Sequence, residues 1–225
     1  IYNRTNQLEG RVILAYDITD RKKLEKDLKD TNESLQAQLQ ENERLRVQLQ
    51  EQAIRDPLTG VFNRRYLAEA LDKETARAVR EKSPFSLIVL DVDFFKKVND
   101  TYGHKCGDLV LQSLAKFLQE NTRRSDIVCR FGGEEFVILM PDAAVEDAYE
   151  RAERFRNNFA LQVVKYEGKQ VKSTFSAGVA SFPVHANVGE TLLSMADLAL
   201  YQSKANGRNR VTVFSPEIEE PAPAK

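Results

Sequence analysis

The sequence has few of the residues that would support thiol or histidine chemistry. Among its 225 residues are two cysteines, Cys106 and Cys129, and two histidines, His104 and His185. The cysteines lack the paired spacing of a zinc site, and without a signal peptide we expect reduced cytosolic thiols rather than a disulfide. The histidines are too few and too far apart to argue for histidine catalysis, so turn and loop roles are expected.

The sequence also lacks a long apolar run and a large net charge. No apolar stretch approaches the roughly 20 residues that span a bilayer. The formal net charge is −1 with both signs interleaved, so no basic footprint for nucleic acid is present. Because the chain begins at Ile1 rather than Met, we expect a fragment of a cytoplasmic protein whose upstream sensor or membrane segment is absent.

Glycine and proline are missing from residues 20–55, where Leu, Glu, Gln, Lys and Arg dominate. This composition predicts one long helix of roughly 50 Å. Positions at alternating four- and three-residue spacing form a coiled-coil seam that carries five leucines: Leu24, Leu28, Leu35, Leu45 and Leu49. Polar residues fill its other positions: Thr31, Gln38, Asn42 and Gln52. A second seam keeps three of them and replaces Leu24 and Leu45 with Leu39 and Ala53. Two balanced registers allow either a switch or a passive spacer, and both interpretations stay open.

Two adjacent glycines, Gly132 and Gly133, separate apolar runs that are typical of strands, residues 127–130 and 136–140. Only glycine takes a positive φ without a steric penalty, so the pair predicts a hairpin turn. The missing side chains would also let a bulky phosphorylated ligand approach the backbone. Two acids follow and could bind the cation that accompanies the phosphates. Taken alone, a surface hairpin with solvated acids is the alternative.

A second segment with acids lies upstream, at residues 86–93. Its apolar run predicts a buried central strand with Asp91 and Asp93 at the carboxyl end, where open α/β sheets place ligand sites. Mg²⁺ usually takes one or two carboxylates, with phosphates and water completing the octahedron. Asp91 and Glu134 could supply that pair. The alternative for Asp91 or Asp93 is an N-cap role at the following helix.

Together these motifs resemble the GGDEF-domain diguanylate cyclases, here with Glu in the third position of the signature. The resemblance runs from about Asp56 to Phe214 and depends on several motifs in the family's order. They are Asp56–Gly60 with Asn63–Arg65, Asp91–Lys96, Asn99-Asp100, Gly103-His104, Gly107-Asp108, Gly132–Glu135, Ala196-Asp197, Ala199–Tyr201, Lys204 and Gly207–Asn209.

The resemblance implies an α/β (α+β) fold: the ferredoxin-like palm of nucleotidyl cyclases, with helices around a mainly antiparallel sheet, preceded by a long parallel coiled-coil helix. We expect a PAS-domain remnant at 1–19, a signalling helix at 20–55, a catalytic domain at 56–215 and a disordered tail at 216–225. The PAS assignment depends on residues 10–21, which resemble the last strand of such a domain and its Asp-Ile-Thr exit.

Local patterns predict further elements in the catalytic domain. Helices are expected at 64–81, between the strand that ends at Asp91 and Glu120, at 144–159 and at 189–204. An antiparallel pair is expected around Gly168, and a last strand at 210–214.

Members of this family condense two GTP molecules to cyclic di-GMP and release two pyrophosphates. Carried over, Asp91, the Val92 carbonyl and Glu134 would hold the metal ions, and Glu135 is a candidate ligand of the second ion. We expect Mg²⁺ or Mn²⁺, two per half-site, to lower the pKa of the attacking 3′-hydroxyl and neutralise phosphate charge. Asp91, Glu134 and Glu135 are then the catalytic residues; whether Glu134 also takes the proton stays open.

The same resemblance implies a GTP site at Phe94, Lys96, Asn99, Asp108, Gly132, Gly133, Lys204 and Arg208. Lys96, Lys204 and Arg208 would contact phosphates; the alternatives are a solvated helix lysine and basic groups at a helix C-terminus. Asn99 and Asp108 would read the base. A carboxylate only accepts hydrogen bonds and guanine offers adjacent N–H donors, whereas adenine presents an acceptor. The alternatives are a turn role for Asn99 and an N-cap role for Asp108.

Arg123 and Asp126 match the family's product-inhibition motif, Arg-x-x-Asp, at its usual distance ahead of the glycine pair. Arg154 matches a secondary arginine that some members use. A guanidinium can grip a phosphate with two hydrogen bonds and stack on guanine, which suits a cyclic dinucleotide. The alternative is a basic helix C-terminus.

Two functional hypotheses follow. In the first, the chain is a diguanylate cyclase that works as a homodimer, because a coiled coil would bring two GTP-loaded half-sites together. Its activity would be regulated through the coil and by cyclic di-GMP. In the alternative, the chain is a catalytically silent module that binds GTP or cyclic di-GMP. The complete set of metal, phosphate and base residues favours the enzyme.

Overall fold

The computed structural model describes residues 2, 4–7 and 13–218, apart from the side chains of residues 47–50 and 52. Two compact units divide the chain, Ile1–Gln50 and Glu51–Lys225, and each is described by itself. Among the residues described, no helix has both the length and the apolar character to cross a membrane.

The first unit consists mainly of the long helix α1, Thr19–Ile54, whose last residues belong to the second unit. It agrees with the helix predicted for residues 20–55. In this single chain the seam leucines whose side chains are described are 45% to 70% exposed: Leu24, Leu28, Leu35, Leu39 and Leu45. The side chain of Leu49 lies outside the described part of the chain. Residues 13–18 form no strand. Residues 10–12 of the predicted PAS segment lie outside the described residues, so the PAS remnant stays a prediction.

The second unit is built on a six-stranded sheet with the order β1-β3-β4-β2-β7-β8. Its central pairs are antiparallel, whereas the edge pairs β1–β3 and β7–β8 are parallel. A mainly antiparallel sheet was predicted and is confirmed. The strands are β1 Phe62–Asn63, β2 Phe85–Val92, β3 Ile127–Gly132, β4 Glu135–Pro141, β7 Phe175–Phe182 and β8 Val211–Val213; β5 Val164–Tyr166 and β6 Lys169–Val171 form the separate predicted hairpin.

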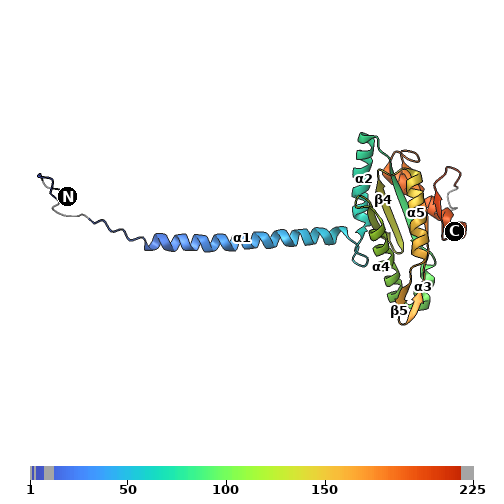
Figure 1. The fold of residues 1–225 in the computed structure, drawn as a ribbon, viewed down its shortest axis with the longest axis horizontal. Helices are drawn as coiled ribbons and strands as arrows, with labels where there is room; N and C mark the ends of the chain where they lie inside the picture. Colours follow the sequence, from blue (N-terminus) through green and yellow to red (C-terminus); the bar gives the residue numbers. More distant parts are fainter. Residues whose placement is uncertain (1, 3, 8–12, 219–225) are drawn as a thin grey trace, which may run out of the picture. The chain divides into compact units, whose positions relative to one another are not determined.

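Helices cover both faces of this sheet (Figure 1). They are α2 Arg64–Glu81, α3 Phe95–Tyr102, α4 His104–Asn121, α5 Val145–Ala160 and α6 Gly189–Ala205. Side chains of β2 alternate between two hydrophobic clusters, because successive residues of a strand point to opposite faces. Ile88 and Leu90 join the cluster under α4 and α5, and Leu87 and Val89 join the cluster under α2 and α6.

The central strand β7 is an element that the sequence analysis missed. Its sequence, Phe-Ser-Ala-Gly-Val-Ala-Ser-Phe, is rich in small residues, which weakens the apolar pattern of a buried strand. The structure explains this composition. A Cβ on Gly178 would overlap backbone atoms of Ala196 and Leu200 in α6. Small residues on β7 therefore let α6 pack directly on the sheet beside the end of β2.

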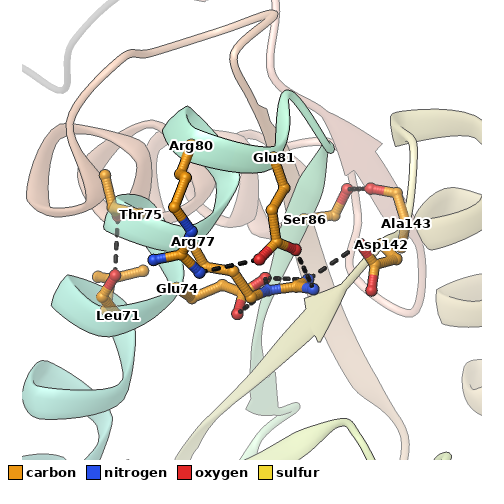
Figure 2. A network of polar contacts seen from close by, with 9 residues as sticks. All are labelled: Leu71, Glu74, Thr75, Arg77, Arg80, Glu81, Ser86, Asp142 and Ala143. Carbon is orange, nitrogen blue, oxygen red and sulfur yellow. Dashed lines mark hydrogen bonds and ion pairs between the residues drawn. The ribbon is translucent and has the colours of Figure 1, made fainter.

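A polar network fastens α2 to the turn after β4 (Figure 2). Arg77 pairs with Glu74 at 2.7 Å, with Glu81 at 3.2 Å and with Asp142 at 2.9 Å. Next to it, the Ser86 hydroxyl donates to the carbonyl of Ala143 at 2.8 Å. The network thus joins α2, β2 and the segment that leads into α5.

Residues 216–218 follow the last strand without entering a helix or strand. The rest of the predicted disordered tail, residues 219–225, lies outside the described residues. The tail and the other domain boundaries therefore remain predictions.

Candidate active site

The strand end and the glycine hairpin meet as the sequence predicts. Asp91 on β2 lies directly opposite Glu135 on β4, and opposite residues of an antiparallel pair share one face. The backbone N–H of Val92 donates to the carbonyl of Glu134 at 3.3 Å. Four candidate metal-binding positions therefore come together from two separate segments of the chain.

Asp91 is the buried member of this group, with 7% of its surface exposed. Its carboxylate pairs with the ammonium of Lys204 at 2.9 Å. Burial raises the pKa of Asp91 to about 6, Lys204 opposes the rise, and the charges of Glu134 and Glu135 add to it. The site thus holds more negative charge than Lys204 compensates. A cation bound here would supply the missing positive charge.

Arg130 fixes the tip of the hairpin. Its Nε and Nη2 donate to the carbonyl of Gly133 at 2.9 and 2.7 Å, and its Nη1 pairs with Asp56 at 3.0 Å. Burial would raise the pKa of Asp56, but hydrogen bonds from Thr59 and Arg130 hold it below its ordinary value. Gly133 has a φ of +46°, which favours glycine. Arg130 thus stabilises the turn that positions Glu134. The sequence analysis did not foresee this role of Arg130.

Asp93 organises the turn between β2 and α3. It is 4% exposed and accepts hydrogen bonds from the Thr174 and Ser176 hydroxyls at 2.6 and 2.7 Å and from the Asn209 N–H at 3.0 Å. The N-cap of α3 is Phe94, without a side-chain cap. The alternative that Asp91 or Asp93 caps this helix is therefore wrong. Asp93 instead joins β2, β7 and the turn after α6.

The turn after α6 brings Arg208 near the end of β2. Arg208 has a φ of +64°, and its guanidinium carbon lies 4.7 Å from the centre of the Phe94 ring. Lys204 is in the last turn of α6 and points to Asp91. Lys96 is exposed in the first turn of α3. Lys204 and Arg208 thus lie near the end of β2. They also lie at the C-terminal end of α6 and in the turn after it, which is the position that the alternative gave them.

The predicted base-reading residues come from neighbouring helices. Asn99 on α3 faces Gly107 on α4, where a Cβ would overlap the Asn99 Oδ1 atom. Among the described residues this buried oxygen has no hydrogen-bond partner. Asp108 is exposed and lies inside α4, which begins at His104, so the N-cap alternative for Asp108 is wrong. Asn99 therefore offers an unused acceptor between the two helices.

The predicted inhibitory site has an unexpected partner. Asp126 is 9% exposed, accepts from the Arg123 N–H at 2.8 Å and forms an ion pair with the buried Arg151 of α5. Asp126 Oδ1 and Arg151 Nη1 find no partner within the described part of the chain. Arg123 lies beyond the end of α4, and Arg154 is exposed one turn further along α5 than Arg151. Sequence analysis missed Arg151, whose partner is distant in the chain.

No three Asp, Glu, His or Cys side chains gather closely enough to hold a metal ion by themselves in the described ranges. The predicted donor set has two to three carboxylates and a carbonyl, and Mg²⁺ commonly completes its shell with substrate phosphates and water. The oxygen donors at the strand end and the uncompensated charge at Asp91 fit such an ion.

Comparisons with known proteins agree with this geometry. The family model "Diguanylate cyclase, GGDEF domain" matches residues 53–210. The response regulator PleD of Caulobacter vibrioides is 44% identical over 72% of this chain and 36% of its own length. The diguanylate cyclase DgcP of Pseudomonas aeruginosa is 41% identical over 72% of this chain and 24% of its own length. The chain thus spans about a third or less of these two relatives.

Solved structures show the same fold. The coiled coil and GGDEF domain of DgcB from Caulobacter crescentus, in complex with c-di-GMP, matches with a TM-score of 0.74 and 30% identity over 84% of this chain and 98% of that chain. The active GGEEF domain of a diguanylate cyclase from Vibrio cholerae matches with a TM-score of 0.65 and 36% identity over 69% of this chain and 98% of that one. The chain therefore belongs to the GGDEF-domain family of diguanylate cyclases.

Proposed function

We propose that this chain is an active diguanylate cyclase that condenses two GTP molecules to cyclic di-GMP and two pyrophosphates. The observation that carries the proposal is the meeting of β2 and the β3–β4 hairpin, where Asp91 lies opposite Glu135 and Val92 is bonded to Glu134. Family membership supports the same activity. The Gly-Gly-Glu-Glu-Phe signature of this chain matches the GGEEF signature named for the Vibrio cholerae domain.

The metal-binding residues are Asp91, the Val92 carbonyl and Glu134, with Glu135 as a candidate for the second of two ions per half-site. When bound, Mg²⁺ or Mn²⁺ supplies positive charge that lowers the pKa of a 3′-hydroxyl and neutralises the phosphates. Burial and the charges of Glu134 and Glu135 raise the pKa of Asp91 despite its pair with Lys204, which supports a site for further positive charge. An added cation would therefore be bound favourably, and Lys204 could then turn to a phosphate.

The substrate lies along α3 and α4 in this proposal. Lys96, Lys204 and Arg208 contact the triphosphate, and the exposed glycines of the hairpin let it approach the backbone. Asn99 and Asp108 read the guanine edge. The unpartnered Asn99 Oδ1 supports this assignment, because a buried acceptor without a donor costs about 1–3 kcal/mol and a base N–H would satisfy it.

A homodimer completes the site. Each subunit holds one GTP, and the half-sites must face each other so that each 3′-hydroxyl meets the opposite α-phosphate. The exposed leucines along α1 support pairing with a second copy, since an apolar stripe on a helix is normally buried. The paired helices raise the local concentration of the second half-site and transmit signals from an upstream sensor in the cytoplasm.

Product inhibition at Arg123, Asp126 and Arg154 is part of the proposal. The arginines would bind phosphate. The unpartnered Asp126 Oδ1 supports a ligand that carries N–H donors, as guanine does.

Incubation of the chain with GTP and Mg²⁺, followed by separation of the products, tests the proposal. We expect cyclic di-GMP and pyrophosphate from the wild type. Glu134→Gln should reduce turnover at least about 100-fold without loss of stability, whereas the exposed Glu146→Gln on α5 should match the wild type. GTP that is bound by the wild type but not consumed would contradict the proposal and favour the silent binding module.

A further inference from the structure

A cavity of about 230 Å³ in the second unit is lined by Arg55, the residue after α1, and by the segment between α4 and β3. It is lined by residues from three parts of the second unit, among them Arg55, Phe62, Thr122, Arg123, Arg124 and Asp126. Arg55 directly follows α1, Phe62 begins β1, and the others lead from the C-cap of α4 into β3. The cavity therefore adjoins both the end of the signalling helix and the predicted inhibitory site.

The charge of this cavity suits an anion. Three of its lining residues are arginines, and its one acid, Asp126, forms an ion pair with Arg151. The carboxylate is thus neutralised from inside, while Arg123 and Arg124 are exposed and Arg55 is half-buried. Guanidinium groups bind phosphate oxygens with parallel hydrogen bonds, so three of them around one cavity favour a phosphate group.

Arg55 is held in place before any ligand binds. Its Nη1 donates to the carbonyl of Gly60 at 2.9 Å, and its guanidinium carbon lies 4.8 Å from the centre of the Phe62 ring. The side chain of Asn63 donates to the carbonyls of Arg55 and Ala53 at 3.4 and 2.9 Å. A guanidinium has five N–H donors, so the bond to Gly60 leaves others for a ligand. Fixing the side chain beforehand lowers the entropy that binding must overcome.

We propose that Arg55, Arg123 and Arg124 form one phosphate-binding pocket and that its ligand is the phosphodiester of the cyclic dinucleotide product. The inference rests on the proposed product inhibition and extends it to Arg55, which the sequence analysis did not select. Bound product then attaches the residue that follows α1 to the segment between α4 and β3. Because such coupling is reciprocal, a signal that moves the end of α1 changes product affinity by the same factor.

The test is a calorimetric titration of the full chain with cyclic di-GMP in the absence of divalent cations. Arg55→Gln keeps an amide donor for the Gly60 carbonyl but loses the charge, and we expect its dissociation constant to rise about tenfold, with Arg55→Lys in between. The control is Arg65→Gln, because Arg65 is exposed on α2 and pairs only loosely with Glu69, at 3.7 Å. The control should bind as the wild type does.

Two further arms separate the explanations. Arg123→Ala should weaken binding of cyclic di-GMP; if it does while Arg55→Gln has no effect, this inference is wrong and the inhibitory site stands. If neither variant changes the affinity, both are wrong. Pyrophosphate and a non-hydrolysable GTP analogue carry the same phosphate chemistry, so a loss of their affinity in Arg55→Gln as large as that for cyclic di-GMP would overturn the choice of ligand.

Binding should also change the junction itself. In the wild type and in Arg65→Gln, cyclic di-GMP should slow amide hydrogen exchange in residues 53–62. In Arg55→Gln this protection should be lost even at saturating ligand. Equal protection in all three proteins would contradict the attachment of Arg55 to the ligand.

Discussion

The network around Arg77 and the polar groups of the predicted ligand sites are both partly buried, but they differ in how completely they are satisfied. Arg77 has three carboxylate partners within 3.2 Å, and the hydrogen bonds that it donates to Glu74 and Asp142 raise its pKa above the ordinary value (Figure 2). Asn99 instead keeps an unpartnered oxygen, and Asp91 has a raised pKa. The polar groups around Arg77 are satisfied without a ligand, whereas those of the predicted ligand sites are not.

Five buried side-chain atoms lack a partner in the part of the chain that the structure describes, and three belong to Asn99, Asp126 and Arg151. The other two are the hydroxyls of Ser83 and Ser173. Such atoms cost stability, so most native proteins satisfy them. Their concentration near the predicted sites suggests that ligands complete them. Mutations around Arg77 should therefore change stability, whereas mutations at the ligand sites should change binding and turnover.

The largest effect on stability is expected at the ion pair of Asp126 and Arg151, which belongs both to a predicted ligand site and to the buried part of the fold. Asp126→Ala leaves the Arg151 cation buried without its partner. We therefore expect the free energy of unfolding, measured in urea, to fall by about 3–5 kcal/mol. The double variant Asp126→Ala/Arg151→Met should recover most of that loss, because it removes both charges. If Asp126→Ala were as stable as the wild type, Asp126 would serve a ligand and not the fold.

Asp91 should make stability depend on pH. Its pKa in the folded chain is about 6, above the ordinary 3.8, so the folded state holds this proton more tightly than the unfolded state. The protonated carboxyl is therefore tolerated below pH 4, and stability is lost as pH rises to about 6. We expect the wild type to lose about 1–3 kcal/mol relative to Asp91→Asn between pH 4 and pH 7, measured by denaturant unfolding without nucleotide. Parallel curves for the two proteins would contradict the burial argument.

Arg77→Met removes three ion pairs but keeps the aliphatic stem. We expect it to lower the free energy of unfolding by about 1–2 kcal/mol, while turnover at saturating GTP stays unchanged. Arg80→Met is the matched control, because Arg80 is 71% exposed and its pair with Glu81 lies at the surface. The control should change stability by less than about 0.5 kcal/mol. A fall in turnover in Arg77→Met alone would link this network to catalysis.

Gly107→Ala should have the smallest effect on stability and a specific effect on substrate. The new methyl group would displace the Asn99 side chain, while alanine favours the helix by about 1 kcal/mol over glycine. We expect KM for GTP to rise about fivefold with little change in melting temperature, which corresponds to about 1 kcal/mol. Lys116→Ala on the exposed face of α4 is the control. An unchanged KM would show that Asn99 does not contact the base.

Local patterns predicted much of this fold because they need only near neighbours. The Gly-Gly pair gave the hairpin, and the apolar run before Asp91 gave the central strand β2. The strand β7 was missed because its residues are small where α6, from another part of the chain, packs closely on Gly178. A local pattern of large apolar residues is therefore absent. The order of the strands, with parallel pairs at both edges, depends on contacts that no local pattern contains.

The candidate site shows the same division. Asp91, Glu134 and Asn99 stand in motifs that can be read along the chain. Asp93 and Arg151 act through partners that are distant in sequence: Asn209 is 116 positions from Asp93, and Asp126 is 25 positions from Arg151. Their roles follow from burial and geometry, so only the folded chain shows that they hold the site residues in place.

A crystal structure with a non-hydrolysable GTP analogue and Mg²⁺ tests the central claim most directly. We expect Mg²⁺ within about 2.0–2.1 Å of oxygens from Asp91, Val92 and Glu134. Lys204 should leave Asp91 for a phosphate, and Asn99 Oδ1 should accept a hydrogen bond from the guanine. A nucleotide bound elsewhere, with Lys204 still paired to Asp91 and no metal between β2 and the hairpin, would contradict the account.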